Sequence, residues 1–295
     1  MIDIASIRAR LESEYDGLTP QLRGAARYAL KEPAFIALYP LRKVAQHAKV
    51  SPATLVRLAK HLGFDSYQDF RDVFRDGMHS GAARYATDAR QLLSYKGGRG
   101  FERAYRAAGE VQIRNITRML GEISPAAVEA AGNRLFKSRR IYILGMRSNY
   151  APAFYFHYVL SVFLPQVILL EDRMGMLIDE LGGIGPKDTL IALSADPYAI
   201  EAVKAVNYAA DQGAGVIAMT DTALSPIAQR AQHVFLVPNE SASFYHSMVP
   251  KMVLLEALVC HLVARGGQAA VDRVKAEFDR RQRFGIYWED KTRGG

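Results

Sequence analysis

Basic side chains between residues 41 and 61 are the first group in this 295-residue chain whose chemistry is evident. The segment holds five Lys and Arg residues and no Asp or Glu, so nothing in it repels a polyanion. Arg57 can chelate the O6 and N7 atoms of guanine, and Thr54 can contact a base edge or a thymine methyl group. Lysine ammonium groups bind DNA phosphates whatever the base sequence. The segment offers three such lysines: Lys43, Lys49 and Lys60. These residue types indicate a DNA-binding surface; the alternative is a solvated basic face on a small helical bundle.

Apolar spacing predicts two helices that would position these side chains. Apolar residues recur at intervals of three and four over Leu41–Ala48 and again over Leu55–Leu62. Ser51-Pro52 is a cap followed by proline in the first helical turn. Three residues join the helices, as in a helix-turn-helix, where the start of the second helix faces the major groove. Ser51 and the free N–H groups behind it would also suit a phosphate.

Further helices are expected around this pair. Thr19-Pro20 predicts the start of one helix, and Ser66 precedes another with three aromatic residues on one side: Tyr67, Phe70 and Phe74. Helical periodicity returns over Phe101–Leu120 and after Ser124-Pro125.

The pattern changes beyond Arg139, where short β-rich runs alternate with helical segments. Such alternation predicts a doubly wound domain with a parallel sheet, and runs without polar alternation are typical of strands covered on both faces. The expected strands are Ile141–Leu144, Val167–Leu170, Thr189–Leu193, Gly215–Met219 and Val234–Val237. The expected helices are Tyr150–Phe163, Met174–Leu181, Tyr198–Asp211, Leu224–Gln232 and a long one at about 244–264. The predicted fold class is therefore α + α/β: an all-helical helix-turn-helix bundle followed by a doubly wound five-stranded parallel sheet.

The loop after the first expected strand, Gly145–Asn149, is the next candidate for chemistry. A strand-to-helix turn with a glycine, a hydroxyl group and free N–H groups can bind an anion. Only one of the three glycines of a dinucleotide-binding loop is present. An ordinary turn is the alternative. The sequence predicts no cofactor and no metal.

Composition and charge bound the class of protein. The chain is 49% hydrophobic and 23% charged, as in globular proteins. Cys260 is the single cysteine, which excludes an intramolecular disulfide. No secretory signal is evident and no apolar stretch reaches the ~20 residues of a membrane span, so we expect a cytoplasmic protein.

Charge is unevenly divided along the chain. Residues 81–140 hold 12 Lys and Arg against five Asp and Glu, whereas residues 141–270 hold seven against 11. This asymmetry favours a front half that meets a polyanion and a back half with another task. The expected domains are a helix-turn-helix domain at 1–80, a helical linker at 81–123, a ligand-binding domain at 124–270 and a tail at 271–295.

Two segments resemble a known family. Leu18–Met78 is similar to the N-terminal domain of the RpiR family of bacterial transcriptional regulators; the run from Val50 to Phe64, VSPATLVRLAKHLGF, follows that family's second-helix pattern nearly residue for residue. Residues 130–265 resemble a sugar isomerase (SIS) domain, a sugar-phosphate-binding fold that forms the second half of these regulators. The resemblance implies DNA binding through Ser51, Thr54 and Arg57, and a small-molecule effector in the SIS domain.

One loop departs from the family pattern. Many SIS domains carry Ser-x-Ser-Gly-x-Thr after the third strand, where this chain has Ser194-Ala195-Asp196-Pro197-Tyr198. Proline lacks an N–H donor, and a carboxylate a few ångströms from a phosphate repels it by about 1–4 kcal/mol. We therefore expect an effector that is not a conventional sugar phosphate, or one whose phosphate binds elsewhere, with Arg147 in compensation. The alternative is that Asp196 merely caps a helix beginning at Pro197. The expected effector-binding residues are Arg147, Ser148, Ser194, Asp196, Tyr198, Glu240 and Ser247.

A regulator and an enzyme are both compatible with a SIS-like domain. In a sugar-phosphate isomerase, Glu240 and His246 could serve as the base and the ring-opening group. The attached DNA-reading module favours a regulator without catalytic residues, and for this family a repressor of carbohydrate catabolism. A single helix-turn-helix reads few base pairs, so we expect a homodimer or homotetramer on double-stranded operator DNA. The aromatic helix Tyr150–Phe163 is the expected subunit interface.

Overall fold

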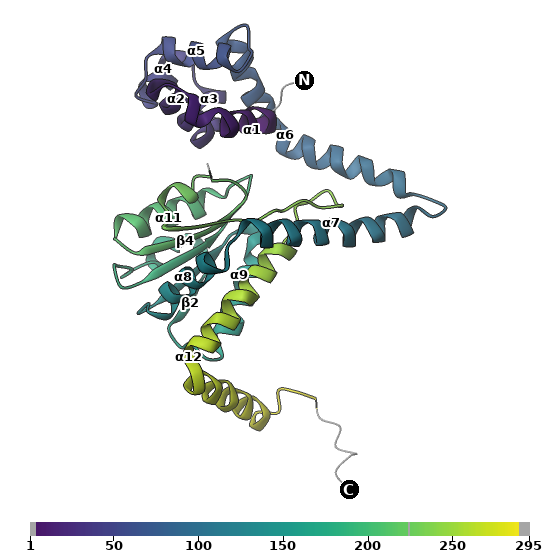
Figure 1. Ribbon diagram of the computed structural model, residues 1–295, viewed down its shortest axis with the longest axis vertical. Helices are drawn as coiled ribbons and strands as arrows, with labels where there is room; N and C mark the ends of the chain where they lie inside the picture. Colours follow the sequence, from purple (N-terminus) through teal and green to yellow (C-terminus); the bar gives the residue numbers. More distant parts are fainter. Residues whose placement is uncertain (1–3, 224, 289–295) are drawn as a thin grey trace. The chain divides into compact units, whose positions relative to one another are not determined.

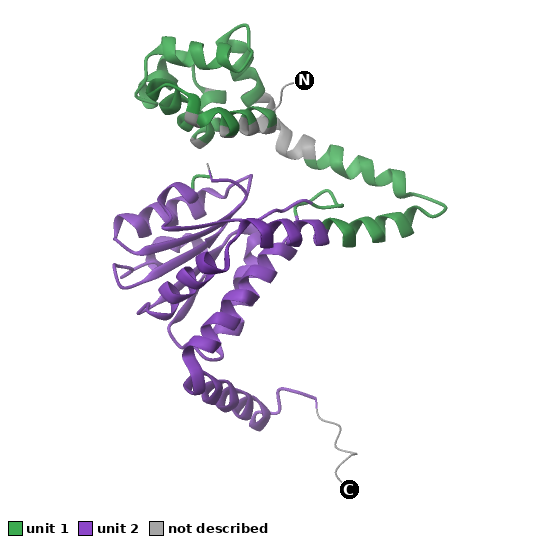
Figure 2. Cartoon of the chain, in the orientation of Figure 1, with its two compact units in different colours: residues 1–111, 224–226, 241–246 green, residues 112–223, 227–240, 247–295 purple. Residues whose placement is uncertain are grey.

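A computed structural model describes residues 4–223 and 225–288, which fall into two compact units (Figure 2). Unit 1 takes in the chain up to Val111 together with the short segments 225–226 and 241–246. Unit 2 contains the rest of the described chain. The helical bundle and the sheet therefore belong to different units, and the predicted fold class is confirmed.

Helices make up unit 1 (Figure 1): α1 (Ile4–Glu14), α2 (Pro20–Lys31), α3 (Pro33–Leu38), α4 (Leu41–His47), α5 (Pro52–His61) and α6 (Tyr67–Gln91). A 3₁₀ turn, Leu92–Tyr95, precedes α7 (Gly100–Glu122), which crosses from unit 1 into unit 2. The predicted caps are present: the Oγ atoms of Ser51 and Ser66 accept hydrogen bonds from the third residue of α5 and of α6.

The predicted apolar stripes form the core of unit 1. On α5 the stripe is fully covered, with Leu55, Leu58 and Ala59 at 0% exposure. On α6, Phe70 and Phe74 are buried with ring centroids 4.8 Å apart. Burial of an aliphatic or aromatic side chain of this size contributes about 1.5–3 kcal/mol, so these stripes hold α5 in a fixed orientation.

Unit 2 is a five-stranded parallel sheet with helices on both faces (Figure 1). Its strand order is β2-β1-β3-β4-β5. The strands are β1 (Ile141–Gly145), β2 (Val167–Leu170), β3 (Thr189–Leu193), β4 (Gly215–Thr220) and β5 (His233–Leu236). The helices are α8 (Pro125–Phe136), α9 (Tyr150–Ser161), α10 (Leu177–Glu180), α11 (Ile200–Asp211) and α12 (Val249–Arg283). All five predicted strands are confirmed to within a residue at either end.

Alternating side chains of β1 supply two separate cores. Ile141 and Ile143 pack with residues of α8, α9 and α12, whereas Tyr142 and Leu144 pack with residues of α10 and α11. This two-sided burial explains why the strand sequences lack polar alternation.

Several predicted helix bounds are wrong. In place of a helix at Leu224–Gln232, the described residues form only the 3₁₀ turn Ala228–Arg230, and the helix expected at Met174–Leu181 is reduced to α10. The long helix begins at Val249 rather than near 244 and continues to Arg283, so residues 271–283 of the expected tail are helical. It bends at Gly267, whose φ of 57° and ψ of −146° suit glycine. Figure 1 shows the bend in α12. No helix in the described ranges is long and apolar enough to cross a membrane.

Candidate DNA-binding surface and ligand site

The basic side chains of α4, α5 and their connecting turn lie exposed on unit 1. The set consists of Arg42, Lys43, Lys49, Arg57 and Lys60. Lys49 has a φ of 53°, the left-handed conformation that lets the chain turn sharply between the two helices. Lys43 Nζ lies 3.9 Å from the centre of the Tyr39 ring, which places its charge beside α4. This geometry leaves the cations available to phosphates or bases.

Thr54 lies in a different environment from the one its predicted role requires. Its side chain is 2% exposed, and its Oγ1 is 2.9 Å from Ser51 Oγ and accepts a 3.4 Å hydrogen bond from Arg57. Because the Thr54 hydroxyl is buried and held by these partners, a direct Thr54–base contact stays a prediction. Thr54 helps to orient Ser51 and Arg57, both of which are exposed.

The far end of α5 is tied to α1 by a small polar network. His61 Nε2 lies 2.6 Å from Glu14 Oε2, and Arg10 donates a 2.9 Å hydrogen bond to the His61 carbonyl. Arg10 and His61 hold the pKa of the Glu14 carboxyl below its usual range. Segment 41–61 contains no Asp or Glu, but the fold brings the Glu14 carboxylate of α1 against His61 at the end of α5.

The carboxyl ends of β1 and β3 form the switch point of the sheet in unit 2, where α/β proteins commonly bind ligands. β2, the next strand in the sequence, pairs with one edge of β1, whereas β3 pairs with the opposite edge of β1. Two of the predicted residues, Asp196 and Tyr198, follow β3 and meet Asp221, which follows β4. Asp221 accepts hydrogen bonds from the Tyr198 hydroxyl at 2.7 Å and from the Asp196 N–H at 3.3 Å.

Asp196 does not cap a helix. The residue before α11 is Ala199, and α11 begins at Ile200, three residues after Pro197. The capping alternative is therefore wrong. The Asp196 side chain is exposed, and its peptide bond to Pro197 is cis. Asp196 and Asp221 together place two carboxylates at the ends of neighbouring strands.

A buried lysine lies within electrostatic reach of Asp221. Lys251, in the first turn of α12, is 0% exposed and donates a 2.6 Å hydrogen bond to Asn149 Oδ1, in the loop after β1. Burial lowers the pKa of Lys251 to about 8, although the charge of Asp221 opposes this shift.

The remaining predicted effector-binding residues are dispersed. Arg147 is exposed with a φ of 56°, Ser148 is half-buried beside it, and Ser194 is buried at the end of β3. Glu240 and Ser247 contact α7: the Glu240 carbonyl accepts a 2.8 Å hydrogen bond from Asn115, and Ser247 donates one of 2.7 Å to Gln112. These contacts do not join Glu240 or Ser247 to the Asp221 group.

Sequence reasoning missed Asp221 and Lys251, and it included Asn149 only as the last residue of the candidate loop Gly145–Asn149. Lys251 and Asn149 are 102 residues apart, so no local spacing relates them. One indication was available, because Lys251 interrupts the apolar run at the start of α12 and would be buried there.

Comparisons with known proteins agree with this two-part architecture. Residues 5–78 match the helix-turn-helix domain of the rpiR family, and residues 134–261 match the SIS domain. Over 255 residues the chain is 23% identical to the HTH-type transcriptional regulator HexR of Pseudomonas aeruginosa, covering 84% of this chain and 85% of that protein.

Two solved structures share the fold. The sugar isomerase domain of an RpiR transcription factor from Sphaerobacter thermophilus has 25% identity and a TM-score of 0.55, covering 59% of this chain and 96% of that one. The NanR protein of Vibrio vulnificus, complexed with ManNAc-6P, has 19% identity and a TM-score of 0.57, covering 94% and 98%. With its helix-turn-helix bundle, its five-stranded sheet and both domain matches, this chain belongs to the RpiR family of transcriptional regulators.

Proposed function

We propose that this protein is a sequence-specific DNA-binding regulator, acting in the cytoplasm as a repressor of carbohydrate-related catabolism. The observation that carries the proposal is the exposed basic face of α4 and α5, whose own sequence contains no Asp or Glu, within an RpiR-type helix-turn-helix. Ser51 and Arg57 are exposed at the start and middle of α5, the part that enters the major groove in this motif. Three lysines contribute affinity through phosphates: Lys43, Lys49 and Lys60.

The SIS-type unit is proposed to bind a small sugar-like effector that shifts the DNA affinity. NanR was solved with a sugar phosphate, which supports a sugar derivative as the ligand class. Effector binding regulates only if it favours one arrangement of the DNA-binding units over another. No turnover is required, so we propose a binding protein rather than a sugar-phosphate isomerase. Glu240, the carboxylate such an isomerase would need, is exposed and faces Arg118 at 3.9 Å.

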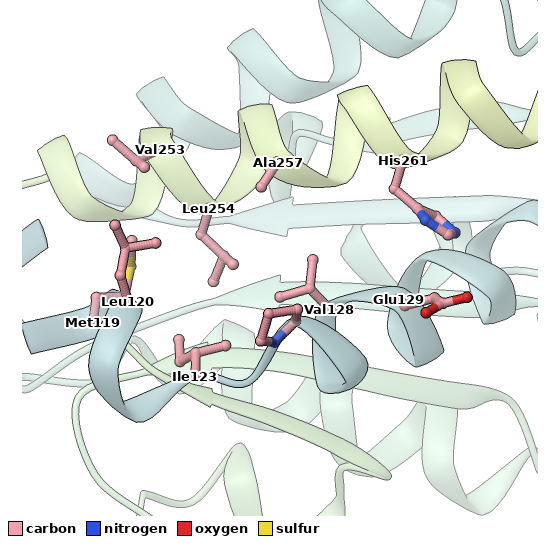
Figure 3. Close-up of a pocket in the computed structure, with 10 residues that line it drawn as sticks. Met119, Leu120, Ile123, Val128, Glu129, Val253, Leu254, Ala257 and His261 are labelled. Carbon is pink, nitrogen blue, oxygen red and sulfur yellow. The ribbon is translucent and has the colours of Figure 1, made fainter. Parts of the chain in front are cut away.

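The regulator is proposed to act as a homo-oligomer, a dimer or a tetramer. On α9, Phe154 and Tyr158 are about half exposed and stack in a row with Tyr150. A second apolar surface of unit 2 is a groove of about 290 Å³ between α7, α8 and α12 (Figure 3). Its lining includes Met119, Leu120, Ile123, Val128, Leu254 and Ala257. Covering apolar surfaces of this kind with a second subunit removes them from water, which favours association.

Selection from a random duplex library tests the proposal. The full chain should enrich pseudo-palindromic sites whose half-sites lie about 34 Å apart, because a two-fold dimer presents two α5 helices to one side of DNA. Recovery of no common sequence, together with turnover of a sugar phosphate by the same preparation, would favour the isomerase.

A further inference from the structure

Lys251 is a buried cation in unit 2 whose chemistry the fold leaves unexplained. Its side chain is completely buried, and in the described part of the chain its Nζ has one hydrogen-bond acceptor, Asn149 Oδ1, at 2.6 Å. An ammonium group has three donors, and an amide oxygen carries no charge to balance it. A charge buried with a neutral partner is costly unless a counter-charge arrives.

The position of Lys251 adds to this cost. It lies in the first turn of α12, where the helix dipole favours anions and disfavours cations. The charge that acts on it is the Asp221 carboxylate, whose oxygens already accept hydrogen bonds from Tyr198 and Asp196. Arg147, on the same loop as Asn149, is exposed. A residue held at such cost beside the ligand-binding end of a parallel sheet is typical of a functional site.

We propose that Lys251 is the anion anchor of the effector site and that the effector is a polyhydroxy carboxylate, a sugar acid. This inference rests on the proposed function and names the ligand class of the same site. The effector carboxylate replaces Asn149 Oδ1 as the partner of Lys251. Hydroxyl groups of the effector donate hydrogen bonds to Asp196 and Asp221, the two carboxylates at the ends of β3 and β4.

Charge favours a carboxylate over a phosphate at this site. A phosphate monoester carries a charge near −2 at neutral pH, so its repulsion by Asp196 and Asp221 is about twice that of a carboxylate. Pro197 removes a backbone donor that a phosphate would use. One ammonium group and one amide match a monoanion with two oxygens, whereas a phosphate presents three oxygens.

Calorimetry on the full chain tests the ligand class. The probes are gluconate, glucuronate and galacturonate, each matched with its neutral sugar, and glucose 6-phosphate and galactose 6-phosphate. At least one carboxylate should bind ten-fold or more tightly than its neutral and phosphorylated counterparts. Binding should weaken between pH 7 and pH 9.5, as Lys251 loses its proton. Tighter binding of a phosphate, or no carboxylate binding, would overturn the proposal.

Two variants test whether Lys251 holds the effector carboxylate. Lys251→Met should weaken carboxylate binding at least ten-fold, whereas Lys204→Met, which removes an exposed lysine of α11, should not. Asn149→Asp should also abolish binding, because a built-in carboxylate would occupy Lys251. Both site variants should melt at or above the temperature of the unchanged protein. A lower melting temperature for both would mean that Lys251 is structural, and would contradict the proposal.

DNA binding by the same proteins separates this inference from the proposed function. Lys251→Met should retain binding to the selected duplex without effector and lose its response to the carboxylate. If the unchanged protein binds no specific duplex but binds a carboxylate through Lys251, the regulator account fails and the ligand assignment stands.

Discussion

Arg57 is the residue on which sequence discrimination should depend. Its guanidinium is exposed and steadied by a 3.4 Å hydrogen bond to Thr54 Oγ1. Loss of a bidentate contact to guanine costs about 1–3 kcal/mol, so Arg57→Ala should weaken binding to the selected site roughly ten- to hundred-fold and relax specificity at one base pair. Fluorescence anisotropy on a set of single-base variants of the site measures this effect.

Lys60→Ala is the matched control for Arg57→Ala. Its ammonium group is exposed on the same helix and is proposed to contact phosphate alone. The variant should weaken binding to all duplexes equally and reduce the dependence on salt. If both variants weakened binding to all duplexes equally, Arg57 would not read a base.

Lys251 also determines how stability changes with pH. Burial lowers its pKa from 10.5 to about 8 in the folded chain. Between these values the unfolded chain binds more protons, so the free energy of unfolding should rise with pH across this window. The difference corresponds to about 3 kcal/mol. Urea unfolding at pH 7, 9 and 10 should show the rise for the unchanged protein relative to Lys251→Met; parallel curves would contradict the buried charge.

At the scale of elements, an ion pair joins the segments that lead into β1 and β3. Asp188 is fully buried and accepts two hydrogen bonds from Arg139, at 2.9 and 2.6 Å, and one from the Gly185 N–H at 2.9 Å. Burial would raise the pKa of Asp188, but Arg139 and the Gly185 N–H outweigh it and hold the pKa below 3.8. The stabilisation is therefore present above about pH 4 and is lost as the pH falls through the folded-state value.

Asp188→Asn should lower the free energy of unfolding by about 1–3 kcal/mol at pH 7, because a charged hydrogen-bonded pair is lost while Arg139 keeps access to water. Asp279→Asn is the control: its 2.8 Å pair with Lys275 lies on the surface and should contribute less than about 1 kcal/mol. Denaturant unfolding compares the two variants. An equal effect of both would show that burial of Asp188 adds nothing.

Elements with strong periodic patterns were predictable from sequence. The stripes of α5 and α6 and all five strands were correct because burial repeats every three to four residues in helices and covers both faces of the strands. Helix boundaries that are set by tertiary contacts were not predictable from the sequence. Ser247, for instance, is held by α7 through Gln112, and α12 begins only at Val249. The sequence predicted that this helix ends near residue 264, yet it continues past a bend at Gly267 to Arg283.

The candidate site was predictable only in part, because its members converge over long stretches of chain. Asp196 and Tyr198 were found from their departure from the family loop, and the fold brings them to Asp221. Asn149 and Lys251 meet across more than 100 residues. The burial of Thr54 was not predicted, because spacing alone does not settle whether a position at the edge of an apolar stripe is covered.

At the scale of the whole molecule, assembly should depend on the apolar surfaces of unit 2. Introducing a charge should disrupt whichever surface is buried, so Phe154→Glu on α9 or Ala257→Glu in the groove should shift the sedimenting species toward the 32.7 kDa monomer. Gln212→Glu, at an exposed polar position just after α11, is the control. A purely monomeric unchanged protein at micromolar concentration would contradict the proposed oligomer.

Sequence-specific DNA binding is the central claim, and a competition measurement tests it most directly. The full chain is bound to the selected duplex at 0.15 M salt and displaced by a scrambled duplex of the same composition. The account predicts a preference of about 10³-fold or more for the selected site and an affinity that falls steeply with added salt. Equal affinity for both duplexes would contradict it.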